Sequence, residues 1–140
     1  MKDLVDVSVI IPCKNEVENL ESTVSSIINS KNYLNFEIII VDDASTDLST
    51  QFLESNKDIY KDVTLIKATN LGAAEARNTG AKFARGKYLF FCDAHVKVPD
   101  LWLDNLVNTL KNANASLVAP CIVDMTNTLE QVMVRRGMSS

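Results

Sequence analysis

The sequence predicts an α/β domain built on a three-layer, mostly parallel, doubly wound sheet. Five short segments are almost continuously apolar and rich in β-branched and aromatic residues: 7–11, 37–41, 63–67, 87–92 and 116–122. Uninterrupted apolarity is typical of strands that are covered on both faces, as the strands of parallel sheets are. The ends of these segments follow one another at steps of 25 to 30 residues, and a βαβ unit takes roughly 30 residues. Right-handed crossovers between successive strands then produce the doubly wound arrangement.

Four segments between the strands predict helices, in the order 17–28, 48–60, 73–84 and 103–110. The first and the last carry apolar side chains at spacings of three and four, as the buried face of a helix does, and the last follows Pro99, a residue that favours the first helical turn. The third is rich in alanine. The second is weaker, because Phe52, Leu53 and Ile59 are its only apolar contacts.

The composition is that of one globular domain. Of the 140 residues, 46% are apolar and 23% are charged, which excludes collagen-like, disordered and disulfide-rich classes. A net charge of −4 with scattered Lys and Arg offers no basic stripe for phosphates and argues against binding a nucleic acid polymer. No apolar run approaches the roughly 18 residues of a membrane-spanning helix, and Asp3 and Asp6 interrupt the start of the chain, unlike in a signal peptide. We expect a single domain over residues 1–140, located in the cytoplasm.

Two polar clusters directly follow predicted strands. Residues 42–47, Asp-Asp-Ala-Ser-Thr-Asp, follow the second strand, and residues 93–95, Asp-Ala-His, follow the fourth. Ligands of doubly wound sheets bind beyond the carboxyl ends of the strands, where the winding direction reverses. If these strands flank the first one, two strand spacings separate the clusters by roughly 10 Å, a gap that a nucleoside diphosphate can bridge. The alternative, which the sequence alone favours equally, is that residues of the first cluster only form an Asx turn and cap the next helix, namely Asp42, Asp43, Ser45 and Asp47.

Asp93 and His95 form the sharper signal of the two clusters. Carboxylate oxygen and neutral imidazole nitrogen are both metal ligands, and two protein ligands leave positions for substrate phosphates and water. His95 is also the only histidine of the chain. An isolated Asp-x-His sequence is more often an acid in a turn beside a surface histidine.

Other polar residues lie at the same edge of the predicted sheet, and for each of them the sequence leaves two roles open. Arg77, on the alanine-rich helix, either contacts an anion in the cleft or pairs with Glu75 on the surface. Lys14, Asn15 and Glu16 follow the first strand at the centre of the edge. There they either contact a ligand or begin the next helix.

Four motifs occur in order along the chain: residues 7–16 (VSVIIPCKNE), 40–47 (IVDDASTD), 76–80 (ARNTG) and 86–95 (GKYLFFCDAH). Together they closely resemble the family 2 glycosyltransferases of the GT-A fold, which is Rossmann-like. The resemblance spans nearly the whole chain, from residue 7 to about residue 125. It implies a binding site for a nucleotide-diphosphate sugar donor, with a UDP-sugar as the expected donor.

The resemblance also implies roles for single residues in nucleotide binding. It implies that Asp43 accepts a hydrogen bond from a pyrimidine N–H and that Asp42 supports the turn. It further implies that Pro12 and Glu16 line the nucleotide site. Arg77 is expected to act in the same site, either by stabilising the diphosphate charge or by holding Asp43.

The metal motif of the family is an Asp-x-Asp sequence that holds Mn²⁺ or Mg²⁺ against the donor diphosphate. Asp93 matches its first acid, which implies contacts with both nucleotide and metal, and His95 replaces its last acid as a metal ligand. The Asp-x-His form is similar to that of the polypeptide N-acetylgalactosaminyltransferases, which share this fold. Imidazole shifts the preference from Mg²⁺ toward Mn²⁺.

The implied reaction is glycosyl transfer to an unknown acceptor, which is a saccharide, a lipid or a peptide. Catalytic domains of the family extend well past the metal motif, so the resemblance implies a sheet truncated on its C-terminal side. It places the catalytic base and the acceptor pocket beyond Ser140, and it leaves residues 126–140 poorly anchored. A non-catalytic nucleotide-binding module is the alternative. A phosphoacceptor receiver domain is a weaker one, because its acid pair would follow the first strand instead of the second.

Overall fold

The computed structural model describes residues 4–113, 117–122 and 131–136, with side chains for residues 4–112. Six strands form one sheet in the order β3-β2-β1-β4-β6-β5. They are β1 (Val7–Cys13), β2 (Phe36–Asp43), β3 (Val63–Ala68), β4 (Tyr88–Cys92), β5 (Leu117–Ile122) and β6 (Gln131–Arg136). Strand β1 pairs in parallel with β2 and β4, and β2 pairs in parallel with β3. The predicted parallel α/β sheet is confirmed for these four neighbouring strands.

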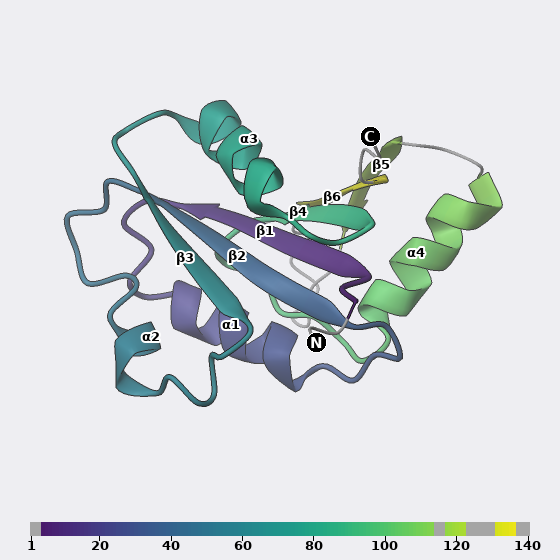
Figure 1. Ribbon diagram of the computed structural model, residues 1–140, viewed down its shortest axis with the longest axis horizontal. Helices are drawn as coiled ribbons and strands as arrows, with labels where there is room; N and C mark the ends of the chain where they lie inside the picture. The colour runs from purple at the N-terminus through teal and green to yellow at the C-terminus, as the bar shows by residue number, and fades with distance from the viewer. Residues whose placement is uncertain (1–3, 114–116, 123–130, 137–140) are drawn as a thin grey trace.

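Four described helices cover this sheet: α1 (Leu20–Asn29), α2 (Phe52–Ser55), α3 (Ala73–Phe83) and α4 (Trp102–Ala113). Side chains of α1 and α4, such as Val24 and Leu103, share one buried cluster with the odd-numbered residues of β1. On the other face, Ala76 of α3 packs with Ile10 and Val41. Figure 1 shows α3 on the opposite side of the sheet from α1. The sheet therefore lies between two helical layers, as the continuous apolar strands predict.

The winding direction of the sheet reverses at β1. The chain moves outward from β1 to β2 and β3, and β4 then pairs with the other side of β1. Because β1, β2 and β4 are parallel, their carboxyl ends lie at one edge of the sheet. Binding crevices of doubly wound sheets open at this position.

Helix α3 rests directly on the sheet at Gly80. A Cβ atom built at this position would lie 2.5 Å from Ile10 Cγ2 and 3.1 Å from Val41 Cγ2. Only glycine lets the helix approach β1 and β2 this closely. Residues three apart lie on one face of a helix, so this contact also sets the position of Arg77 relative to the sheet.

Two predicted helices differ from those observed. Instead of spanning residues 48–60, α2 has four residues, because Phe52 and Leu53 are only half-buried and give it little apolar surface to pack. Helix α1 begins at Leu20, three residues later than predicted, and leaves Val17 49% exposed. None of the helices in the described part of the chain is both long and apolar enough to cross a bilayer.

Strand β6 is not predicted by the sequence pattern. It runs antiparallel between β4 and β5, so β5 does not lie beside β4 as successive crossovers would place it. Its apolar run is only Val-Met-Val, and its partners are distant in sequence, which leaves no local signal. The expectation that residues 126–140 are poorly anchored is therefore wrong for Gln131–Arg136, while the other residues of that stretch lie outside the described ones.

Candidate functional site

A pocket of about 360 Å³ opens at the carboxyl ends of β1, β2 and β4. Among its lining residues are five that the sequence predicts: Pro12, Glu16, Asp43, Arg77 and Asp93. The others are Cys13, Lys14, Asn70, Gly72, Ala73 and Ala76. The two polar clusters that follow the second and fourth strands therefore contribute to one pocket, with β1 between them.

Asp43 lies where the end of β2 meets the start of α3. Its Oδ1 accepts a hydrogen bond from the backbone N–H of Leu71 at 2.6 Å, and its Oδ2 accepts one from that of Gly72 at 2.8 Å. The bond from Leu71 is the main cause that holds the pKa of Asp43 below its ordinary value, with smaller contributions from Gly72 and the charge of Lys14 and a partial opposition from burial. A negative charge at a helix N-terminus is also favourable. Asp43 is thus an ionised acceptor that faces the pocket.

The loop between β3 and α3 supplies pocket residues that sequence reasoning leaves without a role. Asn70 and Gly72 both have a positive φ, of 65° and 93°, and Gly72 is the N-cap of α3. Lys14 Nζ donates to Asn70 Oδ1 at 2.5 Å and so joins this loop to the end of β1. The only sequence signal for this part of the pocket is a glycine directly before the alanine-rich helix.

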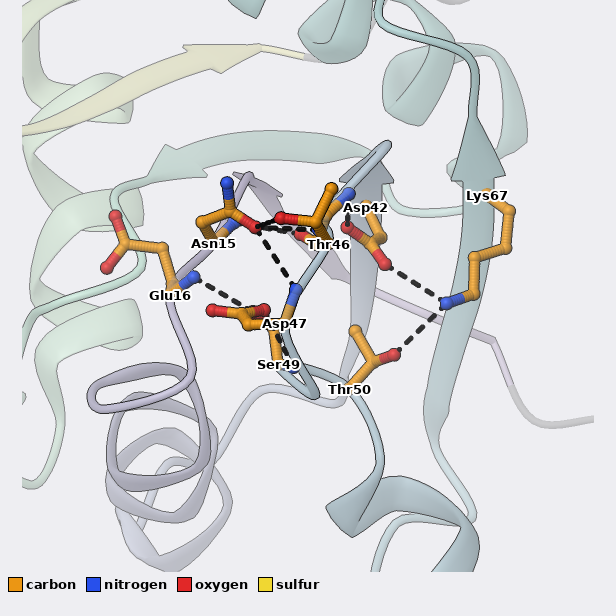
Figure 2. A network of polar contacts seen from close by, with 9 residues as sticks. Asn15, Glu16, Asp42, Thr46, Asp47, Ser49, Thr50 and Lys67 are labelled. Atoms are coloured by element: carbon orange, nitrogen blue, oxygen red, sulfur yellow. Dashed lines mark hydrogen bonds and ion pairs between the residues drawn. The ribbon is translucent and has the colours of Figure 1, made fainter.

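Asn15 connects the ends of β1 and β2 and does not line the pocket. Its φ of 56° lies in the left-handed region, which asparagine tolerates better than most residues. Its Oδ1 accepts hydrogen bonds from the backbone N–H groups of Thr46 at 2.7 Å and Asp47 at 3.3 Å, and its own N–H donates to Ser45 Oγ at 2.9 Å. Figure 2 shows Asn15 at the centre of this network.

Asp47 stabilises the start of the chain segment that leads into α1. Its Oδ2 accepts a hydrogen bond from the N–H of Val17 at 3.2 Å, and its Oδ1 accepts one from the N–H of Ser49 at 3.0 Å. Ser49 Oγ in turn accepts from the N–H of Glu16 at 2.9 Å. The hydrogen bond from the Ser49 side chain is the main cause that lowers the pKa of Asp47. Asp47 thus has the turn role that the sequence leaves open.

Asp42 also takes part in the turn and does not line the pocket. It is 3% exposed, accepts from the N–H of Ser45 at 3.2 Å and pairs with Lys67 Nζ at 3.0 Å. Lys67 also donates to Thr50 Oγ1 at 3.2 Å (Figure 2). The acidic cluster is therefore divided, because Asp42 and Asp47 bind the loop whereas Asp43 faces the pocket.

Arg77 and Asp93 line the pocket from α3 and from the end of β4. Within the described part of the chain, neither side chain forms a hydrogen bond or an ion pair. The surface pair between Arg77 and Glu75 is absent, since Glu75 Oε1 instead accepts from Asn78 Nδ2 at 3.4 Å. A half-buried guanidinium and a half-buried carboxylate in one pocket, both lacking protein partners, are the groups most suited to a charged ligand.

His95 follows Asp93 but is not part of the pocket lining. Ala94, Val96 and Val98 are buried, whereas His95 and Lys97 are exposed. This alternation turns His95 away from the core. No group of three or more His, Cys, Asp or Glu side chains suited to a metal ion is present among the described residues, so a cation held here would take Asp93 and His95 as protein donors and complete its shell with ligand oxygens and water.

Cys13 contributes a thiol to the pocket wall. Burial, followed by the negative charge of Asp42, raises the pKa of Cys13 to about 12. The thiol is therefore protonated at neutral pH and is not a nucleophile. Cys13 and Cys92 are both buried, and neither forms a disulfide within the described part of the chain.

A larger hollow of about 640 Å³ lies at the amino ends of the strands. Its charged wall includes Glu37 and Arg85, which are already paired with each other, and Glu37 also accepts from Ser8 Oγ at 2.6 Å. The rest of the lining is mainly apolar, with residues such as Leu34 and Ile59. The smaller pocket is the candidate site because it lies at the carboxyl ends of β1, β2 and β4, where the winding of the sheet reverses and ligands of doubly wound sheets bind.

Two relatives found by comparison with known sequences are both described as glycosyltransferases. The chain is 35% identical over 117 residues to YibD of Escherichia coli (strain K12), described as an uncharacterized glycosyltransferase, in a match that covers 84% of this chain and 33% of YibD. It is 34% identical over 116 residues to the poly(ribitol-phosphate) beta-N-acetylglucosaminyltransferase TarP of Staphylococcus aureus (strain N315), covering 80% of this chain and 35% of TarP. The chain thus spans about a third of the length of these relatives.

Solved structures share the fold. The mannosyltransferase PcManGT from Pyrobaculum calidifontis, in complex with GDP-Man and Mn²⁺, matches with a TM-score of 0.73 and 26% identity over 86% of this chain and 36% of its own. Staphylococcus aureus TarS 1-349, in complex with UDP-GlcNAc, matches with a TM-score of 0.68 and 22% identity over 81% of this chain and 33% of its own, a likeness of fold alone. The sequence model described as "Glycosyl transferase family 2" matches residues 8–134. The chain therefore belongs to glycosyl transferase family 2.

Proposed function

We propose that the pocket binds a nucleotide-diphosphate sugar and that the chain is the donor-binding part of a glycosyltransferase. The observation that supports this most is the meeting of Asp43, Arg77 and Asp93 in one pocket at the reversal of the sheet. The pocket offers an ionised acceptor, Asp43, at the end of β2. It also offers two charged side chains without a partner among the described residues, Arg77 on α3 and Asp93 after β4. A nucleoside diphosphate needs both kinds of group, because its nucleobase has N–H donors and its phosphates are negatively charged.

The nucleobase is proposed to bind beside Asp43. A carboxylate has about four lone-pair sites, and the N–H groups of Leu71 and Gly72 use two of them. The remaining sites are free to accept an N–H of a pyrimidine such as uracil. UDP is therefore the proposed nucleotide, and GDP is the comparison, since PcManGT was solved with GDP-Man.

The diphosphate is proposed to bind near Arg77 and Asp93. A guanidinium matches phosphate oxygens in geometry and charge. Asp93 repels phosphate unless a cation lies between them, so its place in the lining supports a metal-dependent site. We propose Mn²⁺, with Mg²⁺ as the alternative, held by Asp93 and His95.

The donor set fits this cation, because carboxylate oxygen and imidazole nitrogen together suit Mn²⁺. When bound, the cation would offset the negative charge of the departing nucleoside diphosphate. Asp93 and His95 would hold it at the pocket, and Arg77 would stabilise the same diphosphate from the side of α3. The catalytic base, the acceptor pocket and the cytoplasmic location also belong to this proposal, with the base and the acceptor pocket expected on residues beyond Ser140.

Calorimetric titration of the chain with UDP and with GDP, each in Mn²⁺ and in EDTA, tests the proposal. We expect UDP to bind more tightly with Mn²⁺, and Asp93→Asn to lose the gain due to the metal while its affinity in EDTA equals or exceeds that of the wild type, because the variant no longer repels the diphosphate. Asp58→Asn, an exposed acid on the α2–β3 connection, is the matched control and should behave as the wild type. Equal UDP affinity in Mn²⁺ and in EDTA would contradict the metal site, and no binding of either nucleotide would contradict the donor site.

A further inference from the structure

Helix α1 presents hydroxyl groups to the chain segment that follows Asp93. Thr23, 1% exposed, and Ser26, one turn later, both lie on the side of α1 that faces residues 94–98. Ser26 Oγ accepts a hydrogen bond from the N–H of Val98 at 2.8 Å. These contacts join a helix distant in sequence to the segment that carries the proposed metal donors.

Thr23 holds this segment on both sides of His95. Its Oγ1 donates to the carbonyl oxygen of Ala94 at 2.7 Å and accepts from the N–H of Val96 at 3.1 Å. One side chain therefore binds the backbone just before and just after the histidine. Asp93 directly precedes Ala94, so the acid lies one peptide away from the backbone that Thr23 binds.

The register of this segment decides which side chains reach the pocket. Ala94 and Val96 are 3% and 2% exposed, while His95 between them is exposed. Because buried and exposed residues alternate from Ala94 to Val98, a shift of one residue along this segment would turn His95 inward and an alanine or valine outward. The hydroxyl of Thr23, which needs a carbonyl and an N–H two residues apart, is satisfied in the observed register.

We propose that Thr23 is a positioning residue of the metal site and that its hydroxyl fixes the Asp93-Ala94-His95 backbone in the geometry that binds the cation. This inference rests on the proposed function, because it concerns the same two donors. The hydroxyl of Thr23 acts through the backbone on both sides of His95, by its hydrogen bonds with Ala94 and Val96. Groups that orient metal ligands without binding the metal typically change its affinity by about 10- to 100-fold.

The test uses the chain with Mn²⁺ alone and follows the imidazole proton signals of His95, which are unique because the chain has one histidine. Paramagnetic Mn²⁺ broadens these signals when it binds nearby. Thr23→Val keeps the shape of the side chain without the hydroxyl, and Thr23→Ser keeps the hydroxyl. Ser26→Ala, on the same helix, is the control that releases the backbone N–H of Val98. Circular dichroism checks the fold, and UDP titration in EDTA checks the pocket without metal.

We expect Thr23→Val to need about tenfold more Mn²⁺ than the wild type for equal broadening, with UDP affinity in EDTA unchanged. Thr23→Ser and Ser26→Ala should match the wild type. The inference is overturned if folded Thr23→Val matches the wild type, or if Thr23→Ser loses Mn²⁺ although its hydroxyl is present. Where Thr23→Val does not fold, Thr23→Ala removes the same hydroxyl and takes its place, with the same expected result and the same result that overturns the inference. If the wild-type signals themselves do not broaden, the proposed metal site fails, which is a different result from a failure of Thr23 alone.

Discussion

Arg85 Nε lies 3.1 Å from Oε1 of Glu37, a carboxylate that is only 3% exposed at the end of the sheet opposite the pocket. The backbone N–H of Arg85 and the hydroxyl of Ser8 donate to its other oxygen, at 2.7 Å and 2.6 Å. Three donors from two residues, Arg85 and Ser8, thus satisfy one buried acid. This arrangement joins β1, β2 and the turn before β4.

Glu37→Gln should therefore lower stability without weakening nucleotide binding. In glutamine an NH₂ group replaces one of the two carboxylate oxygens, so it can no longer accept from Arg85 or Ser8. Leaving a buried donor unsatisfied in this way costs about 1–3 kcal/mol. Urea unfolding measures the loss, and Glu54→Gln, at an exposed site on α2, is the matched control. A folded Glu37→Gln protein with strongly reduced UDP affinity would show that the two ends of the sheet are coupled.

Gly80→Ala should destabilise the fold and also weaken nucleotide binding. The added methyl group would meet Ile10 Cγ2 at 2.5 Å, and overpacking of this kind typically costs about 1–3 kcal/mol. Because α3 must move away from the sheet, Arg77 moves with it. Thermal unfolding and UDP titration report the two effects, with Thr79→Ala on the same helix as control. A melting temperature above that of the wild type would show that helix propensity outweighs the contact.

Arg77→Ala should weaken binding of UDP but not of uridine. Arg77 has no hydrogen bond or ion pair with another described residue, so its removal should change stability by no more than about 0.5 kcal/mol. Loss of a charge-assisted hydrogen bond to the diphosphate should reduce UDP affinity by about 10- to 100-fold. Lys82→Ala, an exposed cation on the same helix, should leave both affinities unchanged. If uridine binding falls by the same factor as UDP binding, Arg77 acts on the base side through Asp43.

Stability should fall in acid as Asp43 and Asp47 become protonated. Hydrogen bonds lower the folded-state pKa of both acids, so their contribution is fully present above the unfolded value of about 3.9. It is lost as the pH falls from there through the lower folded values. Urea unfolding between pH 2 and pH 6 should show a shallower acid slope in Asp43→Asn than in the wild type. Asp58→Asn should keep the wild-type slope, and an unchanged slope in Asp43→Asn would contradict the role given to the Leu71 and Gly72 amides.

Much of the fold and the pocket could be predicted because both follow from parallel pairing. Continuous apolar runs indicate strands that are buried on both faces, and the carboxyl ends of such strands share one edge. Asp43, at the end of β2, and Asp93, just after β4, therefore had to lie near each other once β1 separated the two strands. Arg77 was harder to place, since its position depends on the close approach of α3 at Gly80.

The sequence does not predict which acid of residues 42–47 faces the pocket and which acids bind the loop. It depends on backbone conformations such as the φ of 66° at Ala44 and of 56° at Asn15, which decide which carboxylate meets which N–H. Alanine rarely adopts such a φ, so the local sequence pattern does not predict this turn. Strand β6 escaped prediction for a different reason, because its pairing is antiparallel and distant in sequence.

Among the residues whose side chains the structure describes, those that line the pocket fall within residues 12–93, which has a consequence for synthesis on the ribosome. Strands β1 to β4 pair with one another without help from β5 or β6. Chain elongation proceeds from the N-terminus at about 5–20 residues per second, so the walls of the pocket can assemble seconds before β6 leaves the exit tunnel. A nascent chain arrested after α4 would then already bind nucleotide, and the later strands would extend a sheet at whose edge Asp43, Arg77 and Asp93 already line the pocket.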